Sequence, residues 1–192
     1  MNRVAVVATH PDDETLGCGG TLLKHRKAGD DVFWIVVTSM KAENGFTRKE
    51  ILRREKEVSK VAGLYRFAGV YHLGFPAAEL DRIGRNALTR SIAAAFAEIE
   101  PSVVYLPFKG DVHSDHDAVF RAAYGCTKVF RCPSIKKVLM METISETELA
   151  PCNSALSFKP NYFSDISRYL DGKIRIMKVY RTEMGRHPFP RS

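Results

Sequence analysis

The sequence predicts a single α/β domain whose mostly parallel β-sheet is covered by helices on both faces. Apolar, β-branched runs such as Val4–Thr9 and Val32–Thr38 are typical of buried strands. Helical patterns separate these runs, so strand and helix alternate along the chain. With 192 residues, the chain is long enough to bury one sizeable core.

The individual elements follow from the same patterns. Strands are predicted at residues 4–9, 32–38, 70–73, 103–106 and 136–142. Helices are predicted at residues 15–28, after Thr47, at 85–100, at 114–130 and after Asp165. Thr47 and Glu50 have the spacing of a capping box, and Ser114 is the expected N-cap of the fourth helix. The last helix is expected to turn four apolar side chains inward, namely Ile166, Leu170, Ile174 and Met177.

The composition is that of an ordinary globular protein, with 45% apolar and 27% charged residues. Most of the net charge of +7 lies at the end of the chain, because residues 166–192 contain seven Lys or Arg and two acids. A basic last helix could bind a polyanion. A solvated helix face, or one that covers an acidic neighbour, is the simpler interpretation. We find no helix-turn-helix, RNP-type or zinc-finger signature and therefore expect no nucleic-acid partner.

The same survey leads us to expect a cytoplasmic protein. No apolar run approaches the roughly 20 residues that a membrane span needs. The N-terminus runs directly into a strand, which leaves no room for a signal peptide. The four cysteines form neither a CxxC pair nor a zinc-ribbon spacing, so we expect reduced thiols (Cys18, Cys126, Cys132 and Cys152).

Two polar clusters follow predicted strands. Residues 10–14 (His-Pro-Asp-Asp-Glu) come directly after the first strand, and residues 113–116 (His-Ser-Asp-His) come after the fourth strand and a short loop. In open parallel sheets, ligands bind beyond the carboxyl ends of the strands. We therefore expect the two clusters to meet at that edge of the sheet.

These residue types predict a metal-assisted hydrolysis. Two histidines and one carboxylate with an open fourth position make a catalytic zinc site. His10, Asp13 and His116 would be the ligands, and Asp12 would take a proton from the attacking water. His113 would protonate the leaving group or stabilise the oxyanion, and its exchange with His116 as a ligand is the alternative. The chemistry indicates that an amide is cleaved, but not which amide.

Both clusters also resemble a known family. Residues 10–14, followed by Gly-Cys-Gly-Gly-Thr at 17–21, resemble the first signature of the PIG-L/LmbE-like N-acetylglucosamine deacetylases, and residues 113–116 resemble their second, HxDH. Further similarity lies in Arg54-x-x-Glu57, in Leu-Gly-Phe-Pro at 73–76 and in Pro-Asn-Tyr-Phe-Ser-Asp-Ile-Ser at 160–167.

The resemblance implies a Rossmann-like fold and a Zn²⁺ cofactor. It implies the same roles for five residues, with His10, Asp13 and His116 as metal ligands, Asp12 as general base and His113 acting on the tetrahedral intermediate. It adds Arg54 as a residue that holds the sugar substrate. Since relatives commonly assemble, it also implies a homo-oligomer.

Two features depart from the family pattern. Ala77 stands where many members have an acid, and Asp81 is a candidate to replace that acid. The chain stops at Ser192, whereas similar proteins continue for a few tens of residues. The chain is therefore either a short member or one that lacks a C-terminal segment.

We conclude that the sequence predicts a zinc-dependent hydrolase that removes the acetyl group from an N-acetylated amino sugar or its conjugate. Two alternatives remain: a zinc amidohydrolase acting on a non-sugar amide, and a non-catalytic metal-containing domain that binds a nucleotide or polyanion. Structural zinc sites are closed by four protein ligands. The predicted set has three ligands and leaves Asp12 free, which favours an enzyme.

Overall fold

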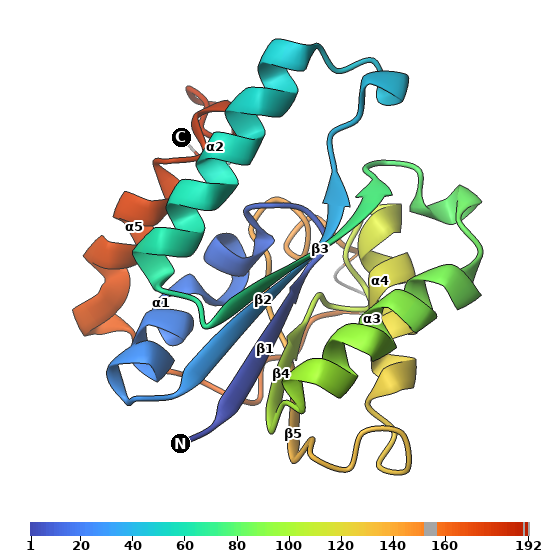
Figure 1. Ribbon diagram of the computed structural model, residues 1–192. Coiled ribbons are helices and arrows are strands. Elements are labelled where there is room, and N and C mark those ends of the chain that lie inside the picture. The colour runs from blue at the N-terminus through green and yellow to red at the C-terminus, as the bar shows by residue number, and fades with distance from the viewer. Residues whose placement is uncertain (152–156, 190, 192) are drawn as a thin grey trace.

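The computed structural model describes residues 1–151, 157–189 and 191, and its centre is a five-stranded sheet (Figure 1). All strand pairs are parallel, in the order β3-β2-β1-β4-β5. The chain therefore builds outward from β1 in one direction and then in the other. This confirms the predicted mostly parallel sheet. The strands are β1 (Arg3–Ala8), β2 (Asp31–Ser39), β3 (Gly69–Pro76), β4 (Val103–Leu106) and β5 (Lys137–Met140).

Helices cover both faces of the sheet, as predicted (Figure 1). One face carries α1 (Asp13–Lys27), α2 (Arg48–Tyr65) and α5 (Leu170–Met177), and the other carries α3 (Arg85–Ile99) and α4 (Ser114–Cys126). Short 3₁₀ turns lie between the strands and helices and after α5 (η1 Ala42–Asn44, η2 Leu80–Arg82, η3 Ser167–Tyr169 and η4 Arg181–Glu183).

Strand β1 lies at the centre of the core. Its side chains alternate between the faces, so that Val4 and Val6 pack with α1 while Ala5 and Val7 pack with α3 and α4. All four are fully buried. Within the described part of the chain, no helix is both long enough and apolar enough to cross a membrane.

Helix α4 begins at Ser114, the first residue of the predicted range, but its N-cap lies one residue earlier than the sequence predicts. His113 is its N-cap, because the His113 Nδ1 accepts a hydrogen bond of 3.1 Å from the backbone N–H of Asp115. Ser114 is the first helical residue. The helix ends at Cys126 rather than at residue 130, and the Thr127 hydroxyl donates to the Tyr124 carbonyl there. Such local side-chain bonds compete with helix continuation.

The inward face of the last helix is also different from the predicted one. Ile176 and Met177 are buried, whereas Leu170 and Ile174 are 46% and 43% exposed. The side of α5 that packs on α1 carries Gly172, Lys173 and Ile176 instead: a Cβ atom at Gly172 would lie 2.9 Å from Leu23 Cδ1, and Lys173 Nζ donates to the Leu16 carbonyl.

Glycines in α1 allow close packing on this face. A Cβ atom at Gly20 would lie 2.7 Å from Ile166 Cδ1, and one at Gly19 would overlap the hydroxyl of Tyr65. That hydroxyl donates to Thr15 Oγ1 at 3.1 Å. The sequence Gly-Cys-Gly-Gly thus provides the small surface that α2 and the segment before α5 require.

We predict that Gly19→Ala destabilises the protein by about 1–3 kcal/mol, since the new methyl group displaces the buried Tyr65 ring. Gly63→Ala in α2 is the matched control, because a Cβ atom there meets open space. It should be neutral or stabilise the helix by about 0.5–1 kcal/mol. Thermal unfolding of the two variants measures the difference, and equal melting temperatures would contradict this packing.

Candidate metal centre and catalytic pocket

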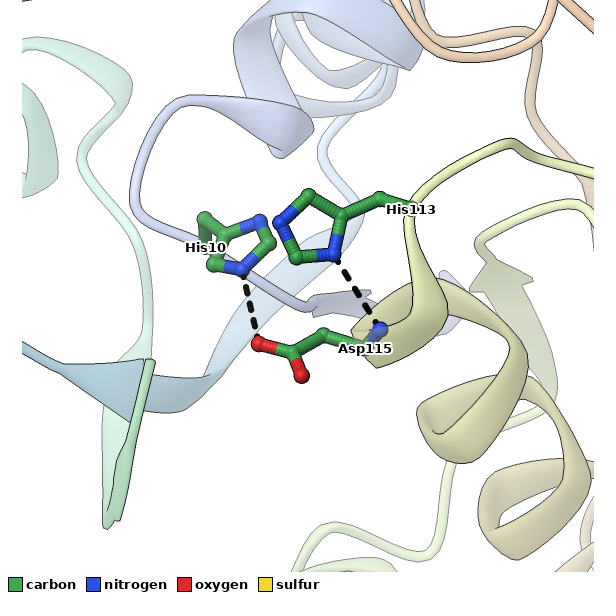
Figure 2. Close-up of side chains that lie close together, drawn as sticks. All are labelled: His10, His113 and Asp115. Carbon is green, nitrogen blue, oxygen red and sulfur yellow. Dashed lines mark hydrogen bonds and ion pairs between the residues drawn. The ribbon is translucent and has the colours of Figure 1, made fainter. Parts of the chain in front are cut away.

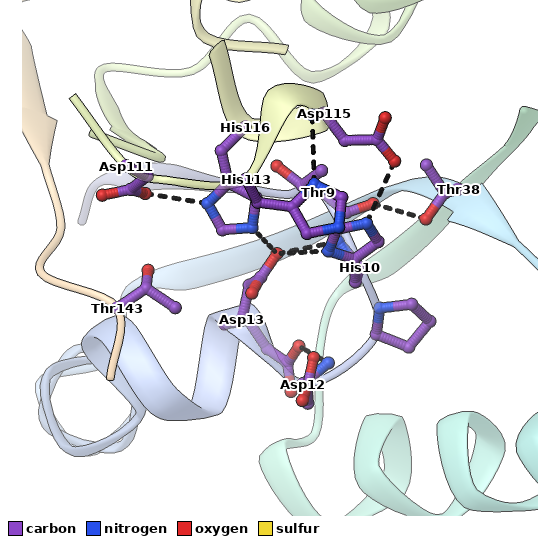
Figure 3. A network of polar contacts seen from close by, with 12 residues as sticks. Thr9, His10, Asp12, Asp13, Thr38, Asp111, His113, Asp115, His116 and Thr143 are labelled. Carbon is purple, nitrogen blue, oxygen red and sulfur yellow. Dashed lines mark hydrogen bonds and ion pairs between the residues drawn. The ribbon is translucent and has the colours of Figure 1, made fainter. Parts of the chain in front are cut away.

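The two histidine clusters meet at the carboxyl edge of the sheet (Figure 3). Their strands, β1 and β4, are hydrogen-bonded neighbours at the point where the strand order reverses. The ring centroid of His10 lies 4.6 Å from that of His113 and 5.4 Å from that of His116. Segments about 100 residues apart thus form one site, at the edge where the sequence predicts it.

His10, Asp13 and His116 form a group that can hold a metal ion. Each offers one ligand atom, and these atoms lie within 4.8 Å of one another. The Oδ2 atom of Asp13 is 3.8 Å from His10 Nδ1 and 3.3 Å from His116 Nε2. This is the predicted ligand set.

A second group, His10, His113 and Asp115, is also compact. Its atoms already have partners, as Figure 2 shows. Asp115 Oδ2 lies 3.2 Å from His10 Nε2 and accepts from the backbone N–H of Ala78, and Asp115 Oδ1 accepts from the N–H of Leu80. His113 Nδ1 accepts from the N–H of Asp115. The first group is therefore the better candidate for a metal.

Carboxylates orient both histidines of this group. Asp115 binds His10 Nε2, which leaves His10 Nδ1 for the metal side. Asp111 Oδ2 lies 2.8 Å from His116 Nδ1, which leaves the buried His116 Nε2 with no hydrogen-bond partner among the described residues. Such carboxylate–histidine pairs are typical of metal centres. A buried nitrogen that makes no hydrogen bond and faces a carboxylate fits a role as a metal ligand.

The electrostatics of the group also fit a cation. Burial opposes a charge on His116, but the carboxylates of Asp13 and Asp111 outweigh burial and raise the pKa of His116 to about 10. Burial likewise opposes a charge on Asp13, yet His116 and His10 hold the pKa of Asp13 at about 2. The buried carboxylates thus favour positive charge at the centre of the group, which a divalent metal would supply.

Asp12 lies beside this group, but its side chain points toward Arg191. Its φ of 134° is outside the usual range for a residue with a side chain, so adjacent carboxylates at 12 and 13 diverge. Arg191 Nη1 donates to Asp12 Oδ2 at 2.6 Å. Asp12 Oδ1 has no hydrogen bond from the described residues. Burial and the charge of Asp13 raise the pKa of Asp12 well above its usual range.

Glu14 stabilises the strained turn at Asp12. It is fully buried, and it accepts hydrogen bonds from the Asp12 N–H at 3.0 Å, from Thr15 Oγ1 at 2.6 Å and from the Tyr180 hydroxyl at 3.0 Å. Burial raises the pKa of Glu14 to about 7. An acid in the first turn of a helix is favourable in any case, so the sequence alone does not reveal this role of Glu14.

His113 has a defined protonation pattern. Because its Nδ1 accepts a hydrogen bond, the proton of the neutral ring is on Nε2. Partial burial and the neighbouring His10 lower the pKa of His113 and keep the ring neutral near pH 7. His113 lines the same cavity as Asp12 and can donate a hydrogen bond into it.

The cavity has a volume of about 270 Å³, at the small end for ligand sites. Arg54 lines it, but its guanidinium is held by protein groups: it donates to the Pro11 carbonyl, Thr182 and Glu183, and its Nε lies 3.4 Å from Glu57. Ala77 also lines the cavity, whereas Asp81 does not.

Several site residues were missed by the sequence analysis. Glu146 and Glu183 line the cavity, Arg191 binds Asp12, and Asp111 binds His116. Asp111 had one signal, since it lies in the loop between the fourth strand and the second histidine cluster. The others lie in segments without a motif, far along the chain from their partners.

We predict that Asp111→Asn lowers metal affinity by about 10–100-fold without unfolding the protein, because the amide orients His116 less strongly. Asp117→Asn is the control, since Asp117 pairs with Arg121 on the exposed side of α4. Metal titration with zinc, followed by elemental analysis, measures the affinities. Equal affinities would show that Asp111 does not support the ligand.

The chain is similar in sequence to known proteins. Residues 5–127 match the PIG-L family, described as GlcNAc-PI de-N-acetylase. The chain is 24% identical to diacetylchitobiose deacetylase of Thermococcus kodakarensis, over 95% of this chain and 70% of that protein. It is 26% identical to the probable N-acetyl-alpha-D-glucosaminyl L-malate deacetylase 2 of Bacillus cereus, over 94% of this chain and 83% of that protein.

The chain is also similar to a solved structure. The conserved protein TT1542 from Thermus thermophilus has a TM-score of 0.73 and 27% identity, and the match covers 96% of this chain and 80% of that one. The family match spans more than half of the chain and includes both histidine clusters. The resemblance inferred from the two clusters is confirmed, and the chain belongs to the PIG-L family.

Proposed function

We propose that this protein is a zinc-dependent N-deacetylase that hydrolyses the acetamide of an N-acetylated amino sugar or its conjugate. One observation supports this most directly: a three-residue ligand group stands next to a carboxylate, Asp12, that lines the same cavity and is not part of the group. An open ligand position beside a free base is the arrangement of a catalytic metal site. The two curated relatives described above are named as deacetylases of acetylated sugars.

The donor set suits zinc. Two imidazole nitrogens and one carboxylate oxygen, from His10, His116 and Asp13, are ligands that catalytic zinc commonly takes. Zinc bound there would act as a Lewis acid on the amide carbonyl and make a water molecule more acidic.

Asp12 then moves the proton. Arg191 holds Asp12 Oδ2, so Oδ1 is available to accept a proton from the attacking water and to return it to the departing amine. The same residue thus serves as base and then as acid. Burial already raises its pKa, which suits a group that must carry a proton for part of the cycle.

His113 stabilises the negative charge that develops on the carbonyl oxygen. Its neutral ring carries a proton on Nε2, and its position is fixed by the N–H of Asp115. A preorganised donor of this kind is most effective where water is excluded.

The cavity sets the size of the reacting group. A volume of about 270 Å³ suits a single sugar ring with its acetamide better than a large ligand. Glu146 and Glu183 line it and can accept hydrogen bonds from sugar hydroxyls. Arg54 contributes to substrate binding by fixing the wall between Pro11 and Glu183. The homo-oligomer and the cytoplasmic location stay predictions.

We predict that Asp12→Asn keeps its zinc and loses about 10²–10⁴-fold in turnover, since only the proton acceptor is removed. Acetate release from diacetylchitobiose and other N-acetylglucosamine conjugates measures turnover, and elemental analysis measures zinc. Asp81→Asn is the control, because Asp81 is exposed and outside the cavity.

Other outcomes would change the assignment. Loss of zinc in Asp12→Asn would make Asp12 a ligand. A wild-type protein that holds one zinc but cleaves only non-sugar amides would be an amidohydrolase of another class. Full zinc occupancy without hydrolysis of any amide would indicate a non-catalytic binding domain.

A further inference from the structure

A strongly basic groove lies between α2 and the segment formed by α5 and η4, two parts of the chain that run side by side in Figure 1. The hollow has a volume of about 970 Å³. Eight of its lining residues are Lys or Arg, and only Glu57 is acidic. This groove is separate from the catalytic cavity and shares no lining residue with it.

The charges on each side of the groove are aligned. On α2, the basic residues recur every three or four positions and so project from one face (Lys49, Arg53, Lys56 and Lys60). The C-terminal segment adds Arg175, Lys178 and Arg181. The stretch of α2 from Arg48 to Lys60 extends about 18 Å along the helix axis. The positive charge therefore forms a strip rather than a point.

These cations lack close acidic partners within the described part of the chain. Among the described residues, none of the eight side chains forms an ion pair or hydrogen bond. Glu57 is already occupied, because its Oε2 lies 3.4 Å from Arg54 Nε and its Oε1 accepts from the Arg181 N–H. The sequence left open that the basic last helix covers an acidic neighbour. The groove side of this segment does not. It faces a second basic surface, and such repulsion is relieved when an anion binds.

The lining of the groove restricts the kind of anion. It contains no aromatic side chain, whereas single-stranded nucleic acids are held by stacking on aromatic rings. Its only apolar side chains are Leu52 and Val179, too few for a helix face that lies in a membrane surface. A linear chain with charged groups along its length fits both the strip of cations and the hollow.

The groove adjoins the catalytic cavity through a thin wall. Arg53 lines the groove, whereas its neighbour Arg54 lines the cavity. Likewise, Arg181 lines the groove and Glu183 lines the cavity. Arg54 connects the two halves of this wall, because it binds Glu57 in α2 and also Thr182 and Glu183 in η4. We propose that the groove binds an acidic glycan, an oligosaccharide chain that carries carboxylate or phosphate groups. The choice of a glycan rests on the proposed function, because the cavity across the wall takes an acetylated sugar.

Binding of fluorescent oligogalacturonate to the zinc-loaded protein tests this proposal, since that probe carries carboxylates and no acetamide. Anisotropy should show binding that weakens between 50 and 200 mM NaCl. The double variant Lys49→Glu/Lys56→Glu should bind at least about tenfold more weakly at low salt. Arg85→Glu/Arg90→Glu on α3 is the matched control and should bind like wild type. Lys49 and Arg85 both lie in a first helical turn, where glutamate is favourable for folding.

Equal binding by the two double variants would overturn the proposal. Tighter binding of a thymidine 20-mer, or of vesicles containing phosphatidylglycerol, than of oligogalacturonate at 150 mM NaCl would overturn the assignment to a glycan. Acetate release is measured separately on neutral diacetylchitobiose. If acetate is released and the variants bind alike, the groove proposal fails alone. If oligogalacturonate binds in the groove but no amide is cleaved, the proposed function fails.

Discussion

The catalytic edge of this protein depends on the carboxylate of Asp13. Its Oδ2 accepts the backbone N–H of His10 at 2.7 Å and lies 3.3 Å from His116 Nε2. One oxygen atom thus connects the end of β1 to the start of α4. Because it is buried, this carboxylate stays charged only through its cationic surroundings, and these lower its pKa despite the burial. The fold therefore brings together buried carboxylates that favour positive charge on the groups between them.

The divergence of two adjacent carboxylates follows from the turn that precedes Asp13. A positive φ at a non-glycine residue costs about 1–3 kcal/mol and persists only where the surroundings hold it. Here Glu14 accepts the N–H of Asp12, and Tyr180 in turn holds Glu14. The strain has a chemical result, because it turns Asp13 toward the histidines and Asp12 toward Arg191. A relaxed turn would not separate the proposed metal ligand, Asp13, from the proposed base, Asp12, in this way.

Much of the fold, and the metal group within it, could be predicted from local patterns. Buried strands are recognisable as β-branched runs, and polar residues directly after two of them mark the edge where parallel sheets bind ligands. Contacts between distant segments have no such local pattern. Tyr180 meets Glu14 across 166 residues, and Arg191 meets Asp12 across 179. The exposed side of α5 was predicted wrongly for a related reason, because the side that packs on α1 carries Gly172 and Lys173, which no apolar pattern marks.

The C-terminal region explains how one chain separates opposite charges. Acidic groups gather inside, around the metal group and the cavity, whereas cations gather in the groove outside. Residues 181–183 belong to both, since Arg181 faces the groove while Glu183 faces the cavity. Arg54 fixes this division by binding acids on both sides of the wall, Glu57 and Glu183. The net charge of +7 is thus a property of one outer surface. The net charge of the whole chain therefore says nothing about the chemistry of the buried, acidic site.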